Sequence, residues 1–377
     1  MLVLVLAAIG YVVYLLAIGK PEPPPKPQWP RRYAGIEIGT RAMRYAIVKI
    51  SRNDGDFEYE LEGRPGSAEF DVKFDRDGRI VNTDELKGII RNVVEEQIIP
   101  AKVPAQDIHI IAGSSYKNSS NLDEVLKDLK TAYPASTVSF LDETTESLVE
   151  LKTLVNPPAE LNQILLIGVG SQTTKIAAYG GKKHVFAKPF DIGVRKLAQD
   201  VADAQQAALA HGSDRQPASP AGKVEELKRL QEAARRILSS GREASKMGKV
   251  LTENPFRSMR ATIITGGLPC VLLQSIGELK VAEFAGGPAV TANNSDRYTL
   301  IQQEELTRFR KFAEEKFTSG HEGDKLCGDF TREELVVGAE LMQILYEKSS
   351  FENKPMFHFD RLTWIPGYFV YQAEKAN

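Results

Sequence analysis

The sequence predicts an α/β protein built from two lobes of the same design that face each other across a cleft. A strand–turn–strand unit with a glycine in its turn occurs at residues 34–50 and again at residues 164–179. Each unit is followed by alternating helix and strand patterns, which is the layering typical of α/β domains. The chain has 377 residues, of which 42% are apolar and 26% charged. It is therefore long enough for two such lobes.

Composition excludes several classes of protein. The formal net charge of −2 does not favour nucleic acid as a partner, and we expect none. Cys270 and Cys327 stand far apart in the sequence and form no disulfide framework or zinc-binding spacing. The five histidines are scattered, so they predict no metal cluster.

Residues 1–19 form an uncharged apolar run, MLVLVLAAIGYVVYLLAIG, followed by Lys20. At ~1.5 Å of rise per residue, a helix of this length matches the ~30 Å hydrocarbon core of a bilayer. A cleaved signal peptide is the alternative, because Ala17-Ile18-Gly19 resembles a small-residue cleavage site. No basic segment precedes the run, and signal peptides have shorter apolar regions of ~7–15 residues. We therefore expect a single transmembrane anchor.

Residues 20–32 read as a spacer, since PEPPPKPQWP favours an extended polyproline conformation. Basic side chains follow the apolar run, and the positive-inside rule then places the large domain in the cytoplasm. These side chains are Lys20, Lys26, Arg31 and Arg32. The expected location is thus a membrane, with possible protein partners in a membrane assembly.

The first lobe, residues 33–158, begins with two strands, AGIEI and MRYAIVKI, joined by the turn GTRA. An extended segment near SAEFDVKFD and a turn at DRDGR follow. Helical spacing of apolar residues covers 83–98, DIHIIAG is a short buried strand, and NLDEVLKDLKTAY is a helix. STVSFL is then a strand and ETTESLVELKTLV a helix.

The second lobe, residues 159–377, repeats this order with strands ILLIG, TTKIAAY and KHVFAKPF. A helix over 192–209, a loop over 211–222 and one long amphipathic helix over 224–246 come next. RATIITGG is a strand that ends in a glycine pair, followed by a helix from Leu268. Residues 282–298 are irregular, and helices near 301–318 and 331–348 precede an aromatic-rich end that we expect to be core.

The two glycine turns have the chemistry of phosphate-binding loops. Gly39 and Gly170 allow successive backbone N–H groups to converge on an anion. Thr40, Ser171 and Thr173 add hydroxyl donors. Each turn alone would read as a simple β-hairpin, and the pair of turns in the same register favours a shared phosphate site.

Several segments in register resemble the exopolyphosphatases and guanosine pentaphosphate phosphatases, a family of the actin-like ATPase (ribonuclease H-like) superfold. IEIGTRAMR resembles the first phosphate loop, I-D-x-G-S-N-S-x-R, and LIGVGSQTTK the second, D-x-G-G-G-S-T-E. IIAGSSYKNSSN, LDETTESLVE, DIGVRKL and ITGG resemble the intervening and following motifs. The resemblance spans about residues 33 to 370 and implies duplicated actin-like lobes around a phosphate-binding cleft.

The resemblance also implies roles for individual residues. Glu37 stands at the metal-binding aspartate, and Glu146 at the catalytic glutamate, with Glu143 the neighbouring candidate. The implied phosphate-binding residues are Gly39, Thr40, Arg41, Lys117, Gly170, Ser171, Gln172, Thr173 and Gly193, and the implied nucleotide-binding residues are Gly266 and Gly267. Polyphosphate or a phosphorylated nucleotide is the implied ligand, and Mg²⁺ is the implied cofactor if the protein is active.

The second loop departs most from the family pattern. Gly168 replaces its aspartate and Lys175 its closing glutamate, so the site loses two negative charges and gains a positive one. Such a site should hold Mg²⁺ less well and tolerate a bare phosphate chain better. Lys175 either contacts phosphate or forms a salt bridge. We therefore expect a degenerate phosphatase acting as sensor or scaffold, and the alternative is an active Mg²⁺-dependent phosphohydrolase.

Overall fold

The computed structural model describes residues 28–63, 65–154, 164–179, 185–210, 220–253, 256–259, 261–276, 298–319, 330–349, 356–359 and 363–377. The expected anchor, residues 1–19, lies outside these ranges, as do residues 20–27 of the expected spacer. No helix within the described ranges has the length and apolar character needed to span a bilayer.

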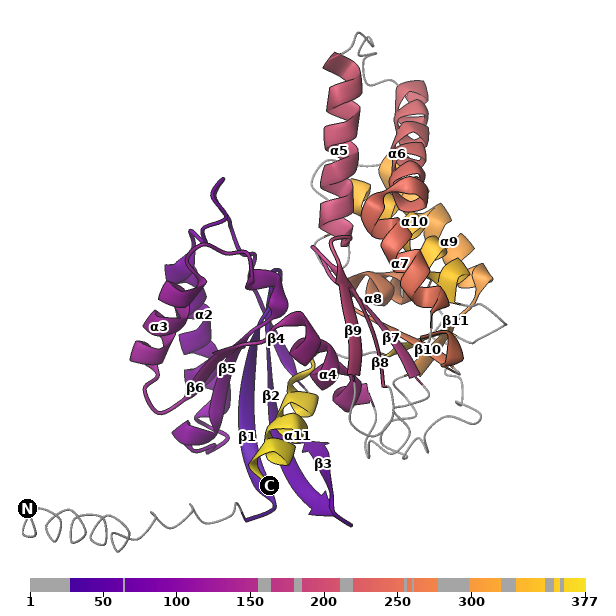
Figure 1. Cartoon of the computed structure of the whole chain (residues 1–377). Coiled ribbons are helices and arrows are strands. Elements are labelled where there is room, and N and C mark those ends of the chain that lie inside the picture. The colour runs from indigo at the N-terminus through magenta and orange to yellow at the C-terminus, as the bar shows by residue number, and fades with distance from the viewer. Residues whose placement is uncertain are drawn as a thin grey trace, which may run out of the picture.

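The first lobe is built on a sheet with the strand order β3-β2-β1-β5-β6, and β4 pairs with β2 at one end (Figure 1). Its strands are β1 (Arg31–Ile38), β2 (Ala42–Asn53), β3 (Asp56–Leu61), β4 (Gly66–Glu69), β5 (Ile108–Ala112) and β6 (Thr137–Phe140). β1 and β2 form the predicted antiparallel hairpin, and β1, β5 and β6 run parallel. β3 is an additional strand that was not predicted, although its sequence DFEYEL alternates charged and apolar residues.

The second lobe repeats this design in a sheet with the order β11-β12-β10-β7-β8-β9. Its strands are β7 (Ile164–Val169), β8 (Thr174–Tyr179), β9 (Val185–Phe190), β10 (Ala261–Thr265), β11 (Tyr298–Ile301) and β12 (Met356–Phe359). The β7–β8 hairpin is antiparallel, and β7, β10 and β12 run parallel. The two hairpins therefore hold equivalent places in two sheets of equivalent order, which confirms the predicted duplication.

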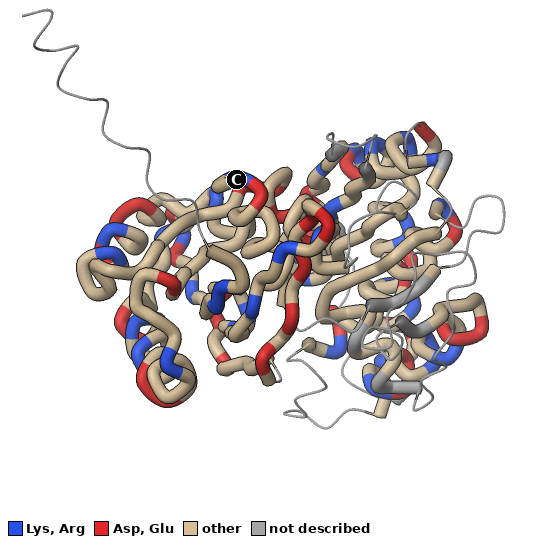
Figure 2. Tube along the Cα trace, turned by 90° about the horizontal axis from the view of Figure 1, so that it is seen from below, with Lys and Arg blue, Asp and Glu red and all other residues tan. Residues whose placement is uncertain are grey.

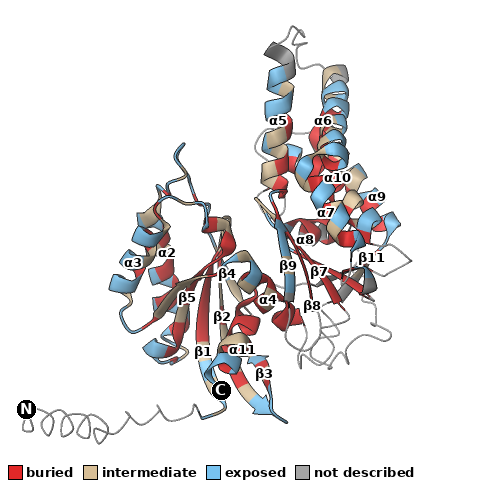
Figure 3. Cartoon of the chain, viewed as in Figure 1, coloured by how far each residue is buried: buried red, intermediate tan, exposed pale blue. Residues whose placement is uncertain are grey.

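Helices cover the sheets, and the central strands β1, β5, β7 and β10 are largely buried (Figure 3). The helices are α2 (Thr83–Val93), continued by a π turn (Val94–Ile98), α3 (Leu122–Ala132), α4 (Glu143–Leu154), α5 (Val194–Ala210), α6 (Pro220–Ser240), α7 (Arg242–Thr252), α8 (Gly267–Ile276), α9 (Gln303–Ser319), α10 (Arg332–Ser349) and α11 (Ile365–Ala376). Short 3₁₀ turns occur at Ala105–Asp107, Ser114–Tyr116 and Phe256–Ser258. α2 and α3 share a core with one face of the first sheet, and α5 to α10 share the main core of the second lobe.

Helix α4 lies between the two lobes. Its Val149 packs in the core under α11, and its Leu151 and Leu154 pack on the second sheet with residues of β7 and β10. A helix with apolar contacts on both sides cannot show a single apolar stripe. The residues at the start of α4 therefore lie at the junction of the two sheets.

The C-terminal helix corrects the predicted division into lobes. α11 packs on α4 and on β1, β2 and β3, so residues 363–377 belong to the core of the first lobe rather than the second. Trp364, Tyr368 and Phe369 are buried there, as expected for the aromatic end. Likewise Arg31 and Arg32, placed in the spacer from sequence, are the first residues of β1.

The long helix expected over 224–246 is two helices. α6 ends at Ser240 and α7 begins at Arg242, with Gly241 in an extended conformation between them. A Cβ atom on Gly241 would lie 2.3 Å from the carbonyl oxygen of Ile237. The break thus depends on a backbone approach that a glycine permits and a larger residue does not.

Acidic and basic residues are interspersed along the trace of both lobes (Figure 2). Many form i,i+3 or i,i+4 pairs on helices, such as Lys196 with Asp200 and Lys246 with Glu243. Pairs of this kind contribute little to stability because water and salt screen them. The charged groups that call for a physical explanation are those buried at the junction of the lobes.

The docking of α11 predicts a pH-dependent stability. Burial, with a further contribution from Arg31, lowers the pKa of His109 from 6.5 to about 4. Its Nδ1 lies 3.0 Å from the hydroxyl oxygen of Tyr368 on α11. Between these pKa values the unfolded chain binds a proton that the folded chain does not, so stability falls as pH falls. From pH 7 to pH 5 we expect His109 to cost about 2 kcal/mol of unfolding free energy.

Urea denaturation at both pH values checks this, with His109→Gln as the comparison. The variant should lose about 2 kcal/mol less than the wild type over the same pH step. Equal losses in the two proteins would contradict a neutral, buried His109.

Candidate functional site

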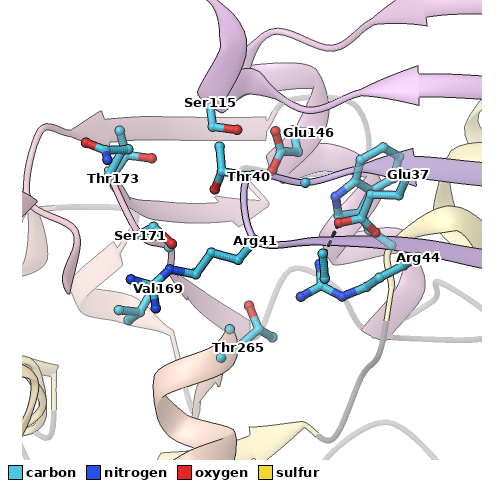
Figure 4. A pocket seen from close by; sticks show the side chains of 18 of the residues that line it. Glu37, Thr40, Arg41, Arg44, Ser115, Glu146, Val169, Ser171, Thr173 and Thr265 are labelled. Carbon is cyan, nitrogen blue, oxygen red and sulfur yellow. Dashed lines mark hydrogen bonds and ion pairs between the residues drawn. The ribbon is translucent and has the colours of Figure 1, made fainter. Parts of the chain in front are cut away.

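A cavity of about 460 Å³ lies where the two hairpin turns, α4 and the β10–α8 junction meet. The predicted site residues that line it are Glu37, Gly39, Thr40, Arg41, Glu146, Gly170, Ser171, Gln172, Thr173, Gly266 and Gly267. Figure 4 shows side chains of both hairpins around this space. Two sheets of the same order thus place two distant turns at one site.

The two turns have the same backbone geometry. The N–H of Gly39 donates to the carbonyl of Ala42 at 3.0 Å, and the N–H of Gly170 donates to that of Thr173 at 2.9 Å. A Cβ atom on Gly39 would lie 2.7 Å from the Ala42 oxygen, which is closer than a side chain tolerates. Glycine therefore sets the tightness of the turn, and the hydroxyl-bearing residues of both turns line the cavity.

Two predicted phosphate-binding residues are not among the described residues that line the cavity. The Lys117 ammonium pairs with Glu143 at the start of α4 instead. Gly193 supports the second turn from outside: a Cβ atom there would lie 2.4 Å from the backbone carbon of Gln172. The next residues donate to the turn, with the N–H of Val194 at 3.1 Å from the carbonyl of Gly170.

Glu37, at the predicted metal position, accepts a hydrogen bond at each of its oxygens. Its two carboxylate oxygens accept from Arg44 Nη1 at 2.8 Å and from the Thr363 hydroxyl at 2.6 Å. Arg44 is its direct partner in the β1–β2 register, so the two side chains lie on one face of the hairpin. Figure 4 shows this pair beside the first turn.

Glu146, at the predicted catalytic position, forms a buried ion pair. Its Oε1 accepts from the Lys175 ammonium, and its Oε2 accepts from the backbone N–H of Ser114 at 2.5 Å. Each side chain is 11% exposed. Of the two roles considered for Lys175, the structure therefore shows the salt bridge.

The pKa of Glu146 is lowered and the pKa of Lys175 is raised by their environment. Burial opposes the charge on Glu146, yet Lys175 and the hydrogen bond from Ser114 hold the pKa of Glu146 below its ordinary value. Burial opposes the charge on Lys175 as well, yet Glu146, Glu150 and Glu37 together raise the pKa of that ammonium. A general base works best with a pKa near the operating pH. Glu146 is thus a weak base whose carboxylate oxygens are both committed.

Arg41 reaches from the first turn toward Ser171 and Val169 of the second lobe (Figure 4). Its Nη2 pairs with Glu334 of α10, and its guanidinium carbon lies 4.8 Å from the ring centroid of Phe330. Its Nε and Nη1 are buried and have no hydrogen-bond partner among the described residues. Buried donors of this kind call for an explanation, and an anionic ligand in the cavity would supply the acceptor.

Gly168 and Lys175 are direct partners in the β7–β8 register. A Cβ atom on Gly168 would lie 3.1 Å from Oε2 of Glu150. Glu150 is buried and lines the cavity, four residues after Glu146 on the same face of α4. This i,i+4 spacing was a signal that could have identified Glu150 from the sequence.

The predicted nucleotide-binding pair also lies at the cavity. Gly266 has a φ of +119°, and a Cβ atom on it would lie 2.0 Å from the carbonyl oxygen of Val169. The glycine thus lets the β10–α8 turn approach the end of β7. Gly267 follows at the first residue of α8, where a Cβ atom would approach the Phe330 ring at 3.3 Å.

No protein-family model matches the sequence, and no curated protein matches it. Solved structures match it over nearly its whole length. A Ppx/GppA family member from Aquifex aeolicus superposes with a TM-score of 0.60 at 16% identity, covering 92% of this chain and 99% of that one. The chain has the Ppx/GppA fold.

Two further structures support this. An exopolyphosphatase from Cytophaga hutchinsonii gives a TM-score of 0.59 at 13% identity and covers 92% of this chain and 99% of its own. An exopolyphosphatase-like protein gives 0.57 at 12% identity, covering 92% and 100%. The Ppx/GppA fold is the one that the sequence resemblance implies.

Proposed function

We propose that this chain binds a phosphate chain or a phosphorylated nucleotide without hydrolysing it and acts as a sensor or scaffold. The observation that carries the proposal is the buried pair between Glu146 and Lys175. Activation of water requires a carboxylate that is able to accept a proton. Here a lysine and a backbone N–H hold both oxygens, and the pKa of Glu146 is lowered.

Three features support binding of an anion. The Ppx/GppA fold brings two glycine turns to one cavity. Hydroxyl groups of Thr40, Ser171 and Thr173 line it. Arg41 presents two buried N–H groups without an acceptor, and a guanidinium matches the geometry of phosphate oxygens.

The second candidate is an active Mg²⁺-dependent phosphohydrolase that releases terminal phosphate from polyphosphate or guanosine pentaphosphate. It is favoured by the carboxylates that line the cavity, which are those of Glu37, Glu69, Glu146 and Glu150. This function would require Lys175 to leave Glu146, because the nucleophilic water needs an acceptor for its proton.

The proposal also places the protein at a membrane, with the large domain on the cytoplasmic side. Its support is the apolar run of residues 1–19 and the basic residues that follow the run. Partners in a membrane assembly are part of the same proposal.

Binding of tripolyphosphate to the full chain, held in mild detergent, tests the proposal through Arg41. We expect Arg41→Gln to weaken binding by ~10-fold or more, because hydrogen bonds to charged groups contribute about 1.5–3 kcal/mol. Arg41→Lys should give an intermediate value, since it keeps the charge and loses the fork of donors. Isothermal titration calorimetry in the presence of EDTA provides the measurement.

The matched control is Arg79→Gln. Arg79 pairs with Glu124 on the surface of the first lobe, and its side chain is 50% exposed. This variant should bind like the wild type. Equal affinities of Arg41→Gln and Arg79→Gln would contradict a phosphate contact at Arg41, and no binding by the wild type would contradict the proposed function.

A further inference from the structure

The cleft of a metal-dependent phosphohydrolase must offer oxygen ligands to a divalent cation. Mg²⁺ requires several oxygen ligands in near-octahedral geometry and is bound through one or two carboxylates. The residues present here do not fit that requirement. Glu37 and Glu146 are each already paired with a cationic side chain, Arg44 and Lys175, whose charge repels a metal ion, and Gly168 contributes no ligand. Across the described ranges, no cluster of three or more His, Cys, Asp or Glu side chains is arranged to hold a metal ion.

A positive charge is nevertheless present among these carboxylates. The Lys175 ammonium pairs directly with Glu146. It also lies near enough to Glu150 and Glu37 for their charges to act on it. All four residues line the same cavity. The ammonium therefore neutralises the carboxylates in the place where a bound cation would do so.

The two hairpins place a basic side chain at equivalent positions, and each neutralises a different carboxylate. In the first, Glu37 faces Arg44 across the register, and in the second, Gly168 faces Lys175. Directly opposed residues of an antiparallel pair point to the same face. Gly168 has no side chain with which Lys175 could pair, and the Lys175 ammonium pairs with Glu146 of α4. Each lobe thus supplies its own basic side chain to a carboxylate of the cleft.

We propose that the Lys175 ammonium is a built-in replacement for a divalent cation, so that the cleft takes its anionic ligand without a metal. The identity of the anionic ligand rests on the proposed function. The inference that Lys175 takes the place of a divalent cation does not depend on that function. Removal of the ammonium should turn Glu146 and Glu150, which share one face of α4, into a pair of carboxylates that attracts a divalent cation.

Binding of Mn²⁺ alone tests this, measured on the full chain without phosphate by loss of the free-ion electron paramagnetic resonance signal. The wild type and Glu146→Gln should give the same Mn²⁺ uptake, because the cleft of the wild type binds no Mn²⁺ through Glu146. Lys175→Met should bind Mn²⁺ at least ~100-fold more tightly than the wild type, because a repelling charge within a few ångströms is gone. The double variant with Glu146→Gln should lose this gain.

Two further variants make the result specific to this lysine. Lys196→Met removes a half-buried lysine that pairs with Asp200, and this variant should bind Mn²⁺ like the wild type. Lys175→Arg keeps the charge and should also bind like the wild type. The melting temperature of Lys175→Met should rise when Mn²⁺ is added, whereas that of the wild type should not change.

Mn²⁺ uptake by the wild type that depends on Glu146 would overturn the proposal, and so would folded Lys175→Met that gains no affinity. If Lys175→Met does not fold, Lys175→Gln is measured in its place. The wild-type measurement can overturn the proposal without either variant. Binding of tripolyphosphate that requires Mg²⁺ would also overturn the proposal while leaving the proposed ligand class intact. Failure of the wild type to bind tripolyphosphate, with the Mn²⁺ results as expected, would overturn the proposed function alone.

Discussion

Lys175→Met is expected to lower the free energy of unfolding by about 3–5 kcal/mol, because it leaves a buried carboxylate without its counter-charge. Glu146 lies at the start of α4 between the lobes, where water cannot solvate it well. Its remaining partner is the N–H of Ser114 at 2.5 Å. Urea denaturation of the full chain in EDTA measures the loss.

The double variant Lys175→Met with Glu146→Gln, compared with the two single variants, measures the interaction energy between the two side chains. Removing both charges should cost less than the sum of the single losses, since neither partner is then left buried and alone. Lys196→Met, on the surface of α5, should change stability by less than about 0.5 kcal/mol. A loss below about 1 kcal/mol for Lys175→Met would contradict a buried ion pair at this position.

Gly367→Ala is expected to destabilise the protein by about 3 kcal/mol, as overpacking of a tight contact does. Gly367 lies on α11 where this helix crosses α4. A Cβ atom there would lie 1.9 Å from the carbonyl oxygen of Val149 and 2.5 Å from the Thr153 hydroxyl oxygen. That hydroxyl also accepts a hydrogen bond from the Gly367 N–H at 3.0 Å. The methyl group would therefore push α11 away from the first lobe.

Gly88→Ala is the matched control. Gly88 lies within α2, and a Cβ atom on it would meet nothing within 4 Å apart from its chain neighbours and the nearby backbone of its own helix, so alanine should stabilise the helix by about 0.5–1 kcal/mol. Thermal unfolding of the two variants should shift in opposite directions. A Gly367→Ala variant as stable as the wild type would contradict the docking of α11 on α4.

Much of the fold could be predicted because its signals are local. Alternating apolar residues mark β2, short apolar runs mark β1, β7 and β8, and the glycines between the paired strands mark the turns. β3 was missed although DFEYEL alternates charged and apolar residues, which is the pattern of a half-buried edge strand. The break at Gly241 was also missed, since the apolar periodicity of α6 and α7 continues across it.

The location of the site was predictable from the sequence, but the partners of its charged residues were less so. The turns, Glu37 and Glu146 follow from short motifs, and Gly168 with Lys175 indicates a change of charge. The partners of these charges come from distant segments. Arg41 meets Glu334 of α10, and Glu37 meets Thr363 before α11. No spacing in the sequence encodes such contacts, because they depend on how the two lobes and the C-terminal helix pack.

The most direct test of the central claim is phosphate release by the full chain from long-chain polyphosphate, guanosine pentaphosphate and ATP, with and without Mg²⁺. Tripolyphosphate binding is measured in parallel on the same preparation. We predict binding that is insensitive to EDTA and no release above that of a Glu146→Ala variant. Mg²⁺-dependent release that Glu146→Ala slows by ~10²–10⁴-fold would contradict it, because Glu146 would then act as a general base despite Lys175.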